Sequence, residues 1–544
     1  MNKDELMKAV TEVDDGMIEE AGKTYKKRSL WPAAAAVAAV LALALLLPPA
    51  LRSGRQIQPT QESSGQEVNS QTQENTQPTR STAPQEMKNT AEETPAGTTA
   101  APAETTPAET ASVPKQDDAA AKFLLASPVY PEQWAREEHY KNHAPGEVDP
   151  LYARRAWARD AEGPYRAFLG KLIDLSLNGE TEENAVMSPI NLFLSLTMLS
   201  EITDGGTRAE FLNALGAPDQ ETLREAAEKI WNLVYYDDGK EKMIPANSLW
   251  LSDELEYRKD TVDLLAEKYY ASVFRGTMGT ETYDQALRSW INAQTGDLLK
   301  EQAEGLSMDA ETRLGLVSTV FYQSKWAVPF RASDNRTAVF HGTDGDKETE
   351  FMFQKMETAT YYYSEKFSFI RLSTMNGMVW FFLPDEGVSV QEMMAEETFQ
   401  GIVSGKYNVD HYYLDDDVME TMEKDGIGAC YIKVNLTVPK MDISRKLDLH
   451  PLMKKLDIQT CFDPLAADFS PILGEDTGFL SGGEQATRIV MDEEGVSAAS
   501  YVDWLVGAAP PPEEEIDFTL DRPFFFMISS PACLPYFAGI MNNP

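Results

Sequence analysis

Apolar and polar positions follow three different patterns along this chain. Residues 30–51 carry no charge and would measure about 33 Å as a helix, which matches one bilayer crossing. Residues 52–120 consist mainly of Thr, Gln, Ser, Pro, Ala and Glu, with too few apolar side chains to form a core. From about residue 156 apolar residues recur at the spacings of helices and strands. The pattern therefore predicts an apolar span, a disordered stalk and one folded domain.

Within the folded domain, residues 156–544, helical spacings come first and strand-like runs come later. An apolar stripe predicts a helix over residues 169–177, and Ser188-Pro189 supply the N-cap and first residue of the next helix. Aromatic and β-branched runs predict strands over residues 377–383, 432–438 and 524–528. This order predicts an α+β domain without internal repeats.

The flanks of the apolar span predict its orientation. Four basic residues lie between positions 23 and 28, and basic residues before a span favour a cytoplasmic N-terminus. Residues 1–29 are then a cytoplasmic leader similar to those of single-pass proteins of Firmicute-type bacteria, and residues 30–51 are a transmembrane anchor. We therefore expect a bacterial cell-membrane protein with its C-terminal domain outside the cell. A cleaved signal sequence is the alternative, and the protein would then be secreted.

Residues 121–155 contain aromatic side chains that would suit docking on the domain, but no periodicity places them. His139 and His143 stand four residues apart, as two metal ligands on one helical face would. A third ligand is missing from this motif, so a solvated surface run is favoured. We expect neither a metal nor a cofactor.

Composition excludes several classes of function. The chain has 87 acidic and 48 basic residues, a net charge of −39, which repels nucleic acid. Its three cysteines are too few and too scattered for a disulfide framework or a zinc cage. None of the five histidines stands in a motif typical of hydrolases, so an enzyme is not expected.

Seven segments of the domain carry short motifs, and the order of these motifs along the chain is itself informative. They are residues 184–191 (NAVMSPIN), 312–330, 381–386 (FFLPDE), 438–441 (VPKM), 461–470, 492–500 and 537–544 (FAGIMNNP). Together they resemble the serpins, a family of serine protease inhibitors. The resemblance implies early helices around a large central mixed β-sheet with an exposed reactive loop. It also implies a metastable fold, whose five-stranded central sheet can accept the cleaved loop as a sixth strand.

An acidic turn, one glycine and a run of small residues resemble the hinge of the reactive loop. The hinge residues are Glu493, Gly495, Val496, Ser497, Ala498, Ala499 and Ser500. If the loop inserts, alternation along a strand gives one face without charge, formed by Val496, Ala498, Ser500, Val502, Trp504 and Val506. The pattern predicts insertion with this face buried. Trp504 is its one bulky member and is expected to slow insertion.

The bait bond is predicted by counting along the loop. The family's usual spacing from Gly495 leads to Ala509-Pro510, within a window that extends over residues 507–512. Proline after the bond makes a poor substrate, so Ala508-Ala509 is the expected bond. Small residues there suit an elastase-like or subtilisin-like protease, and the absence of Lys or Arg between Gly495 and Asp521 argues against a trypsin-like one.

Two further regions are expected to gate insertion. Trp326 matches the tryptophan of the family's breach, and Ser188, Ser318 and Gln485 match its shutter. The family usually has serine, asparagine and histidine in the shutter, so two of the three residues are replaced. A glutamine has the donors and acceptors to bridge two hydroxyls, and we expect an altered opening rate.

The resemblance thus predicts a suicide-substrate inhibitor of a serine protease, monomeric and held at the plasma membrane by one helix. The alternative is a non-inhibitory binding module with the same fold, whose loop is cleaved without trapping the protease.

Overall fold

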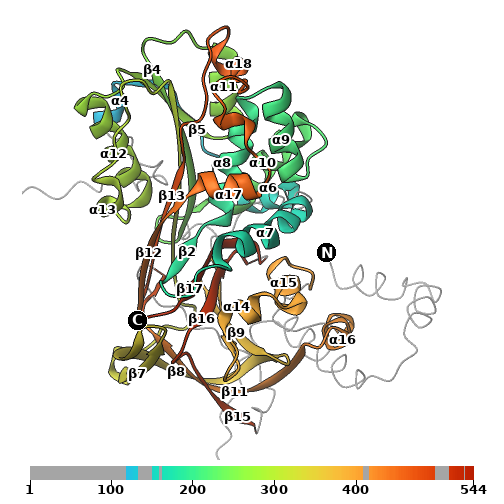
Figure 1. The fold of residues 1–544 in the computed structure, drawn as a ribbon. Helices are drawn as coiled ribbons and strands as arrows, with labels where there is room; N and C mark the ends of the chain where they lie inside the picture. Colours follow the sequence, from blue (N-terminus) through green and yellow to red (C-terminus); the bar gives the residue numbers. More distant parts are fainter. Residues whose placement is uncertain (1–117, 133–149, 159–161, 408–415, 497–513, 532) are drawn as a thin grey trace, which may run out of the picture. The chain divides into compact units, whose positions relative to one another are not determined.

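The computed structural model describes residues 118–132, 150–158, 162–407, 416–496, 514–531 and 533–544 (Figure 1). The predicted leader, anchor and nearly all of the stalk lie outside these ranges. Within them, no helix has the length and apolarity that a membrane crossing requires.

The central sheet is divided into two hydrogen-bonded ladders. The first contains, in spatial order, β1 (Leu124–Ala126), β5 (Ala271–Gly276), β4 (Lys242–Ser252), β6 (Leu314–Lys325) and β14 (Gly495–Val496), with β3 (Tyr236–Asp237) beside β4. The second contains β12 (Met441–Asp448) and β13 (Glu484–Met491). We call the boundary between β6 and β13 the seam.

The seam departs from the continuous five-stranded sheet that the resemblance implies. Within the described ranges β6 and β13 form no ladder with each other; at the C-terminal end of β6, β14 pairs with β6 and contacts β13. The neighbouring strand β4 is buried from its second residue onward, whereas most of β6 is only half-buried. Among the described residues, no strand pairs with this edge of β6 over residues 314–323.

A second, mixed sheet forms the lower part of the domain in Figure 1. Its strands are, in order, β15 (Glu515–Thr519), β11 (Gly428–Pro439), β8 (Gly345–Tyr363), β9 (Phe367–Thr374), β10 (Gly377–Pro384), β16 (Phe524–Ser529), β17 (Pro535–Met541) and β2 (Ala185–Met187), with β7 (Arg336–Gly342) beside β8. The three strands predicted from aromatic and β-branched runs are confirmed as parts of β10, β11 and β16. β15 runs parallel to β11, while the other pairs are antiparallel.

Most of the described helices precede β6 in the sequence. They are α4 (Asp118–Ala121), α6 (Pro150–Ala158), α7 (Glu162–Leu177), α8 (Pro189–Glu201), α9 (Gly205–Leu215), α10 (Gln220–Val234), α11 (Lys259–Lys268), α12 (Glu281–Thr295) and α13 (Lys300–Ala303). Shorter ones follow: α14 (Val390–Met394), α15 (Glu397–Val403), α16 (Asp416–Lys424), α17 (Leu449–Lys455) and α18 (Ser470–Leu473), with single turns at Ala332–Asp334 and Thr460–Phe462. The predicted N-cap is confirmed, since the Ser188 hydroxyl accepts a hydrogen bond from the amide of Asn191. The α+β prediction is likewise confirmed.

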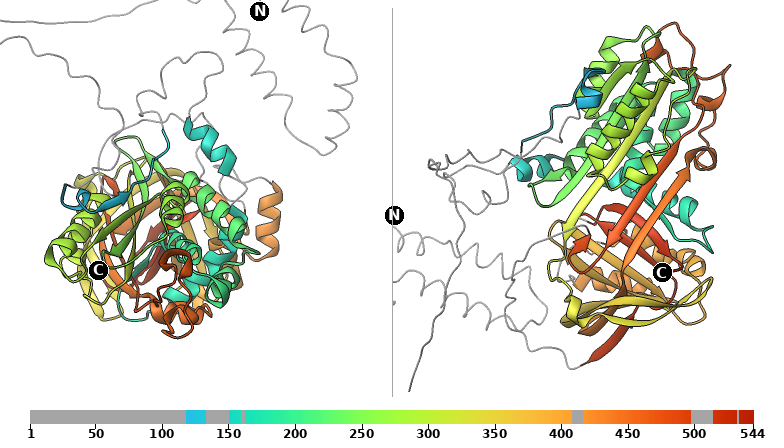
Figure 2. Two further views of the ribbon diagram at one scale, coloured as in Figure 1. Left: turned by 90° about the horizontal axis from the view of Figure 1, so that it is seen from above. Right: turned by 90° about the vertical axis from the view of Figure 1, so that its left-hand side faces the viewer.

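Helices cover both faces of the first ladder (Figure 2), and a hydrophobic core lies on each face. The larger includes the fully buried helix α8, which packs against β6 and β17. The smaller lies under α12 and includes Trp250, Phe274, Tyr283 and Trp290. Strand β6 therefore runs between α8 and α12.

Candidate functional site

Gly495 and Val496 of the hinge already form a strand, β14, in the seam. Gly495 pairs with Lys325 and Val496 with Ser324, antiparallel to β6. Val496 is 2% exposed and belongs to the larger core, on the face that was predicted to be buried. Gly495 has a φ of +156°, and a Cβ there would lie 2.5 Å from the carbonyl oxygen of Ser324, so only glycine fits.

The acidic residue of the hinge is held by a lysine and an asparagine. The Glu493 carboxylate lies 2.9 Å from Lys440 Nζ and accepts a hydrogen bond of 2.5 Å from Asn335 Nδ2. Lys440 and Asn335 also bind Glu350 on β8, at 3.0 and 2.9 Å. Burial raises the pKa of Glu493, but the hydrogen bonds from Lys440 and Asn335 outweigh it and lower the pKa overall. We call Glu493, Lys440, Asn335 and Glu350 the hinge latch.

Trp326, the predicted breach residue, lies directly beneath the hinge. Its indole Nε1 donates to the carbonyl of Asp492 at 2.8 Å, and its amide donates to the carbonyl of Glu494 at 3.1 Å. The amide of Phe330 donates to the carbonyl of Glu493 at 3.0 Å. The hinge is thus fixed to the end of β6 by three donors, in addition to the hinge latch.

The structure brings two of the three predicted shutter residues together. The Ser188 amide donates to Gln485 Oε1 at 3.0 Å, and Gln485 Nε2 donates to the Ser188 carbonyl at 2.9 Å. The prediction that Gln485 bridges two hydroxyls is wrong, because its side chain binds the backbone amide and carbonyl of Ser188 instead. The Ser188 hydroxyl donates instead to the carbonyl of Tyr536 at 2.8 Å. The start of α8 is therefore bonded to β13.

Ser318, the third predicted shutter residue, is bonded to a neighbour that the sequence did not indicate. Its hydroxyl donates to Asn247 Oδ1 on β4 at 2.7 Å, and Asn247 Nδ2 donates to the carbonyl of Tyr269 at 2.9 Å. An asparagine is thus present beside Ser318, supplied by the adjacent strand. Only the strand register, which pairs Asn247 with Ser318, brings the two side chains together.

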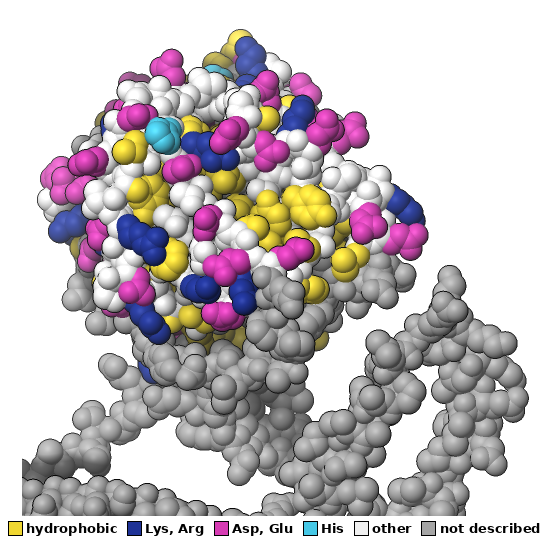
Figure 3. Space-filling model, turned by 90° about the horizontal axis from the view of Figure 1, so that it is seen from below, with side chains coloured by type: hydrophobic (Ala, Val, Ile, Leu, Met, Phe, Trp, Pro, Cys, Tyr) yellow, Lys and Arg dark blue, Asp and Glu magenta, His cyan; other side chains and the backbone are white. Residues whose placement is uncertain are grey.

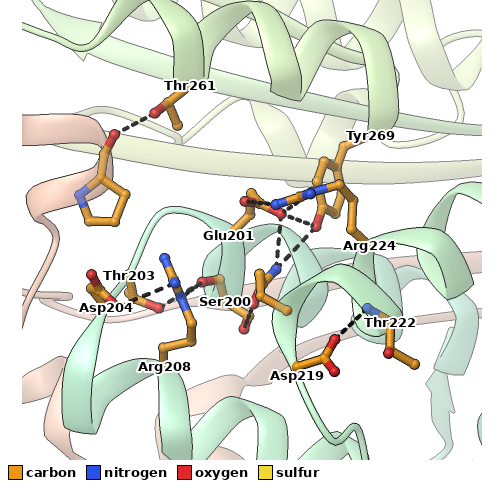
Figure 4. Close-up of polar contacts among 12 residues, drawn as sticks. Ser200, Glu201, Thr203, Asp204, Arg208, Asp219, Thr222, Arg224, Thr261 and Tyr269 are labelled. Atoms are coloured by element: carbon orange, nitrogen blue, oxygen red, sulfur yellow. Dashed lines mark hydrogen bonds and ion pairs between the residues drawn. The ribbon is translucent and has the colours of Figure 1, made fainter.

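The far end of α8 is held by an ion pair between buried Glu201 and half-buried Arg224 (Figure 4). The Glu201 carboxylate accepts two hydrogen bonds of 2.8 Å from the Arg224 guanidinium, and further ones from Tyr269 at 2.8 Å and Gln220 at 3.0 Å. Burial raises the pKa of Glu201, but these hydrogen bonds outweigh it, so the pKa lies below its ordinary value. Helix α8 is therefore bonded to β13 at its start and to α10 at its end.

Helix α12 and the chain after it cover the other face of the seam. A Cβ at Gly296 would lie 3.1 Å from the Phe321 ring on β6, and Ala486 of β13 packs against the core under α12. Arg488 of β13 binds Asp442 through two hydrogen bonds of 2.9 and 2.8 Å, and donates to the carbonyl of Leu298 at 3.4 Å. An incoming strand would therefore lie between α8 and α12.

The remaining predicted residues lie outside the described part of the chain. These are Ser497, Ala498, Ala499, Ser500, Ala508, Ala509 and Pro510, together with His139 and His143. Among the described residues no group of three or more His, Cys, Asp or Glu side chains could hold a metal ion. Cys430, Cys461 and Cys533 are unbridged.

Comparison with known proteins places this geometry in a family. The model of the family "Serpin (serine protease inhibitor)" matches residues 166–544. Serpin-ZXA of Oryza sativa subsp. japonica is 25% identical over 379 residues, covering 67% of this chain and 91% of that protein. Plasminogen activator inhibitor 1 of Bos taurus is 22% identical, covering 69% and 90%.

Solved structures agree on the fold. Native Tengpin, a thermophilic serpin, aligns with a TM-score of 0.59 at 20% identity, covering 76% of this chain and all of that one. Human glycosylated kallistatin aligns with a TM-score of 0.58 at 18% identity, covering 71% and 99%. Since the family model spans more than half of the chain, this protein belongs to the serpin family.

Proposed function

We propose that this protein is a suicide-substrate inhibitor of a serine protease, which works by inserting its cleaved loop into the seam. The observation that carries the proposal is β14, which is already the first piece of a strand on the open edge of β6. Val496 is buried there with no charge to desolvate. The family description supports the same activity class.

The register of β14 specifies where each further loop residue would lie. Because Val496 meets Ser324, antiparallel pairing brings Ala498 opposite Tyr322, Val502 opposite Ser318 and Trp504 opposite Leu316. These residues share the face of Val496, toward α8, and the only charge, Asp503, takes the face toward α12. The ten residues 497–506 would add a strand of roughly 34 Å.

Trapping then requires no catalytic group of this protein. The protease serine attacks the bait bond and forms an acyl-enzyme, and the bond's far side leaves. Insertion of the freed loop pulls the attached protease and distorts its oxyanion hole, so that deacylation stalls. The far side of the loop stays behind, because β15 is paired to β11 over five residues, starting with Glu515 opposite Lys433.

The bait sequence, rather than surface charge, is the proposed basis of protease selection. The end of the molecule that carries β11 and β15 mixes acidic, basic and apolar side chains (Figure 3). Glu515, next to the loop, lies 3.2 Å from Lys355 and is partly neutralised. We therefore expect Ala508-Ala509 to select an elastase-like or subtilisin-like protease.

We also propose that the protein lies outside a bacterial cell, anchored by residues 30–51.

A binding module without inhibitory activity is the second candidate. Trp504 favours it, because the register requires this indole to be buried opposite Leu316, between β6 and α8. If the indole stops insertion, the acyl-enzyme hydrolyses before the protease is distorted. The loop would then be cut without a trapped complex.

Mixing the purified chain with elastase-like, subtilisin-like and trypsin-like proteases tests the proposal. A covalent band at the summed mass on denaturing gels, with a cut mapped to residues 507–512, is the expected result. Val496→Glu should abolish the band while leaving cleavage, because its charge would be buried, whereas Ser497→Glu on the opposite face should retain it. Cleavage with full protease activity remaining would refute inhibition and support the binding module.

A further inference from the structure

Residues 118–130 form a short segment that lies outside the part matched by the family model, residues 166–544. Its strand β1 pairs with β5, with Leu124 opposite Phe274 and Ala126 opposite Val273. This is the edge of the first ladder farthest from the seam, since the strand order runs from β1 to β14. We call residues 118–130 the edge strap.

The beginning of the edge strap is packed into the core under α12. Ala120 is 1% exposed, and the Phe123 ring lies 4.8 Å from the Tyr283 ring of α12 in an edge-to-face arrangement. The amide of Arg275 donates to the carbonyl of Phe123 at 2.8 Å. A Cβ on Gly276 would lie under 3 Å from both rings, so the glycine makes room for this contact.

The end of the edge strap packs on the opposite face of the ladder. The Tyr130 ring is stacked 5.4 Å from Trp231 of α10 and 5.3 Å from Tyr235, which follows that helix. The indole Nε1 of Trp231 donates to the carbonyl of Pro245 in β4 at 2.9 Å. Tyr130 therefore covers the contact between α10 and β4.

These contacts connect the two cores around one sheet edge. Neighbouring strands lie about 4.8 Å apart, so admitting a new strand into the seam requires β6, with β4 and β5, to shift relative to α8 and α10. The edge strap touches α12, β5 and α10 at once, so such a shift strains its contacts. We propose that the edge strap restrains the opening of the seam and thereby sets the rate of strand insertion. The effect on the rate of insertion rests on the proposed function. The restraint on the seam does not, because it is a property of the fold before cleavage.

Amide hydrogen exchange of the full-length chain tests the restraint without any protease. Tyr130→Ala removes the stacking on Trp231 and Tyr235, and Phe123→Ala removes the contact with Tyr283. In each variant we expect exchange at the amides of β5 and β6 to accelerate by about tenfold. Val129→Ala is the matched control in the same segment, because Val129 is 87% exposed, and it should change exchange less than twofold. A synthetic peptide of residues 118–132 should slow exchange again when added to Tyr130→Ala. If Phe123→Ala does not fold, Tyr130→Ala decides alone.

Unchanged exchange in β5 and β6 of the folded Tyr130→Ala variant would overturn the proposal, whether or not the protein inhibits a protease. Faster exchange together with a larger ratio of trapped to cleaved product would support both the restraint and its effect on insertion. Faster exchange without any trapped complex, in the variant or the parent chain, would support the restraint and refute inhibition.

Discussion

Replacing Glu493 by alanine tests whether the hinge latch keeps the loop in its resting position. The substitution removes the 2.9 Å ion pair with Lys440 and the hydrogen bond from Asn335, the residues that immediately precede β12 and β7. It leaves β14 and Trp326 in place. The expected result is a hinge that detaches more often from the end of β6.

The size of the effect follows from exposure. The Glu493 side chain is 16% exposed and that of Lys440 is 36% exposed, so solvent screens the pair in part. Exposed ion pairs contribute up to about 1 kcal/mol, and hydrogen bonds to a buried charge up to about 3 kcal/mol. A value of about 1.5 kcal/mol lies between these limits and corresponds to roughly tenfold in the hinge-opening equilibrium.

Amide exchange at Trp326 and Phe330 measures this directly, because both N–H groups donate to hinge carbonyls. Glu350→Ala is a matched control, since Glu350 binds the same lysine and asparagine but belongs to β8. We expect about tenfold faster exchange in Glu493→Ala and less than twofold in Glu350→Ala. Equal rates in the two variants would refute the argument that Glu493 holds the hinge.

Three other substitutions have defined outcomes. Gly495→Ala should displace β14 from β6 and lower stability by about 1–3 kcal/mol, measured by urea unfolding, because its Cβ would meet the Ser324 carbonyl. Gln485→Leu should lower stability by about 1–3 kcal/mol, because it removes two hydrogen bonds and leaves the Ser188 amide unpaired, while the Ser188 carbonyl keeps its bond from the Leu192 amide; an unchanged midpoint would contradict the contact. The pKa of the Glu201 carboxylate is lowered in the folded protein. The stability that this group contributes is therefore fully present above its pKa in the unfolded chain, about 4.3, and is lost as pH falls through its pKa in the folded protein. Glu201→Gln should therefore cost about 1–3 kcal/mol at pH 7, because Arg224 loses its charged partner but is partly exposed to solvent. It should also weaken the acid dependence of the melting temperature, and an equally steep dependence would speak against the assignment.

Local chemistry explains which parts of the fold were predictable. Ser188-Pro189 predicted the start of α8 because an N-cap and a proline at the first position act within one turn. The aromatic runs in β10 and β16 predicted strands because both are buried along most of their length. The face of Val496 followed from alternation alone, and its burial fits that pattern.

Long-range contacts explain what the sequence did not predict. β1 has only three residues and exists because β5 offers an edge, and Tyr130 is held by rings about a hundred residues away. Asn247 reaches Ser318 only through the register of β4 and β6. Gln485 binds the backbone of Ser188, because the hydroxyl is already used by the carbonyl of Tyr536.

The anchors of α8 indicate which elements must move when a strand enters. Gln485 bonds the start of α8 to β13, and Glu201 bonds its end to α10, whereas β6 only packs against the helix. The hydrogen bonds hold β13, α8 and α10 together, so the seam widens most easily by moving β6. Strand β6 carries β4, β5 and α12 with it, and these are the elements that the edge strap connects to α10. Weakening Gln485 would instead free β13 to move, so combining Gln485→Leu with Tyr130→Ala should accelerate insertion by less than the product of the two single effects.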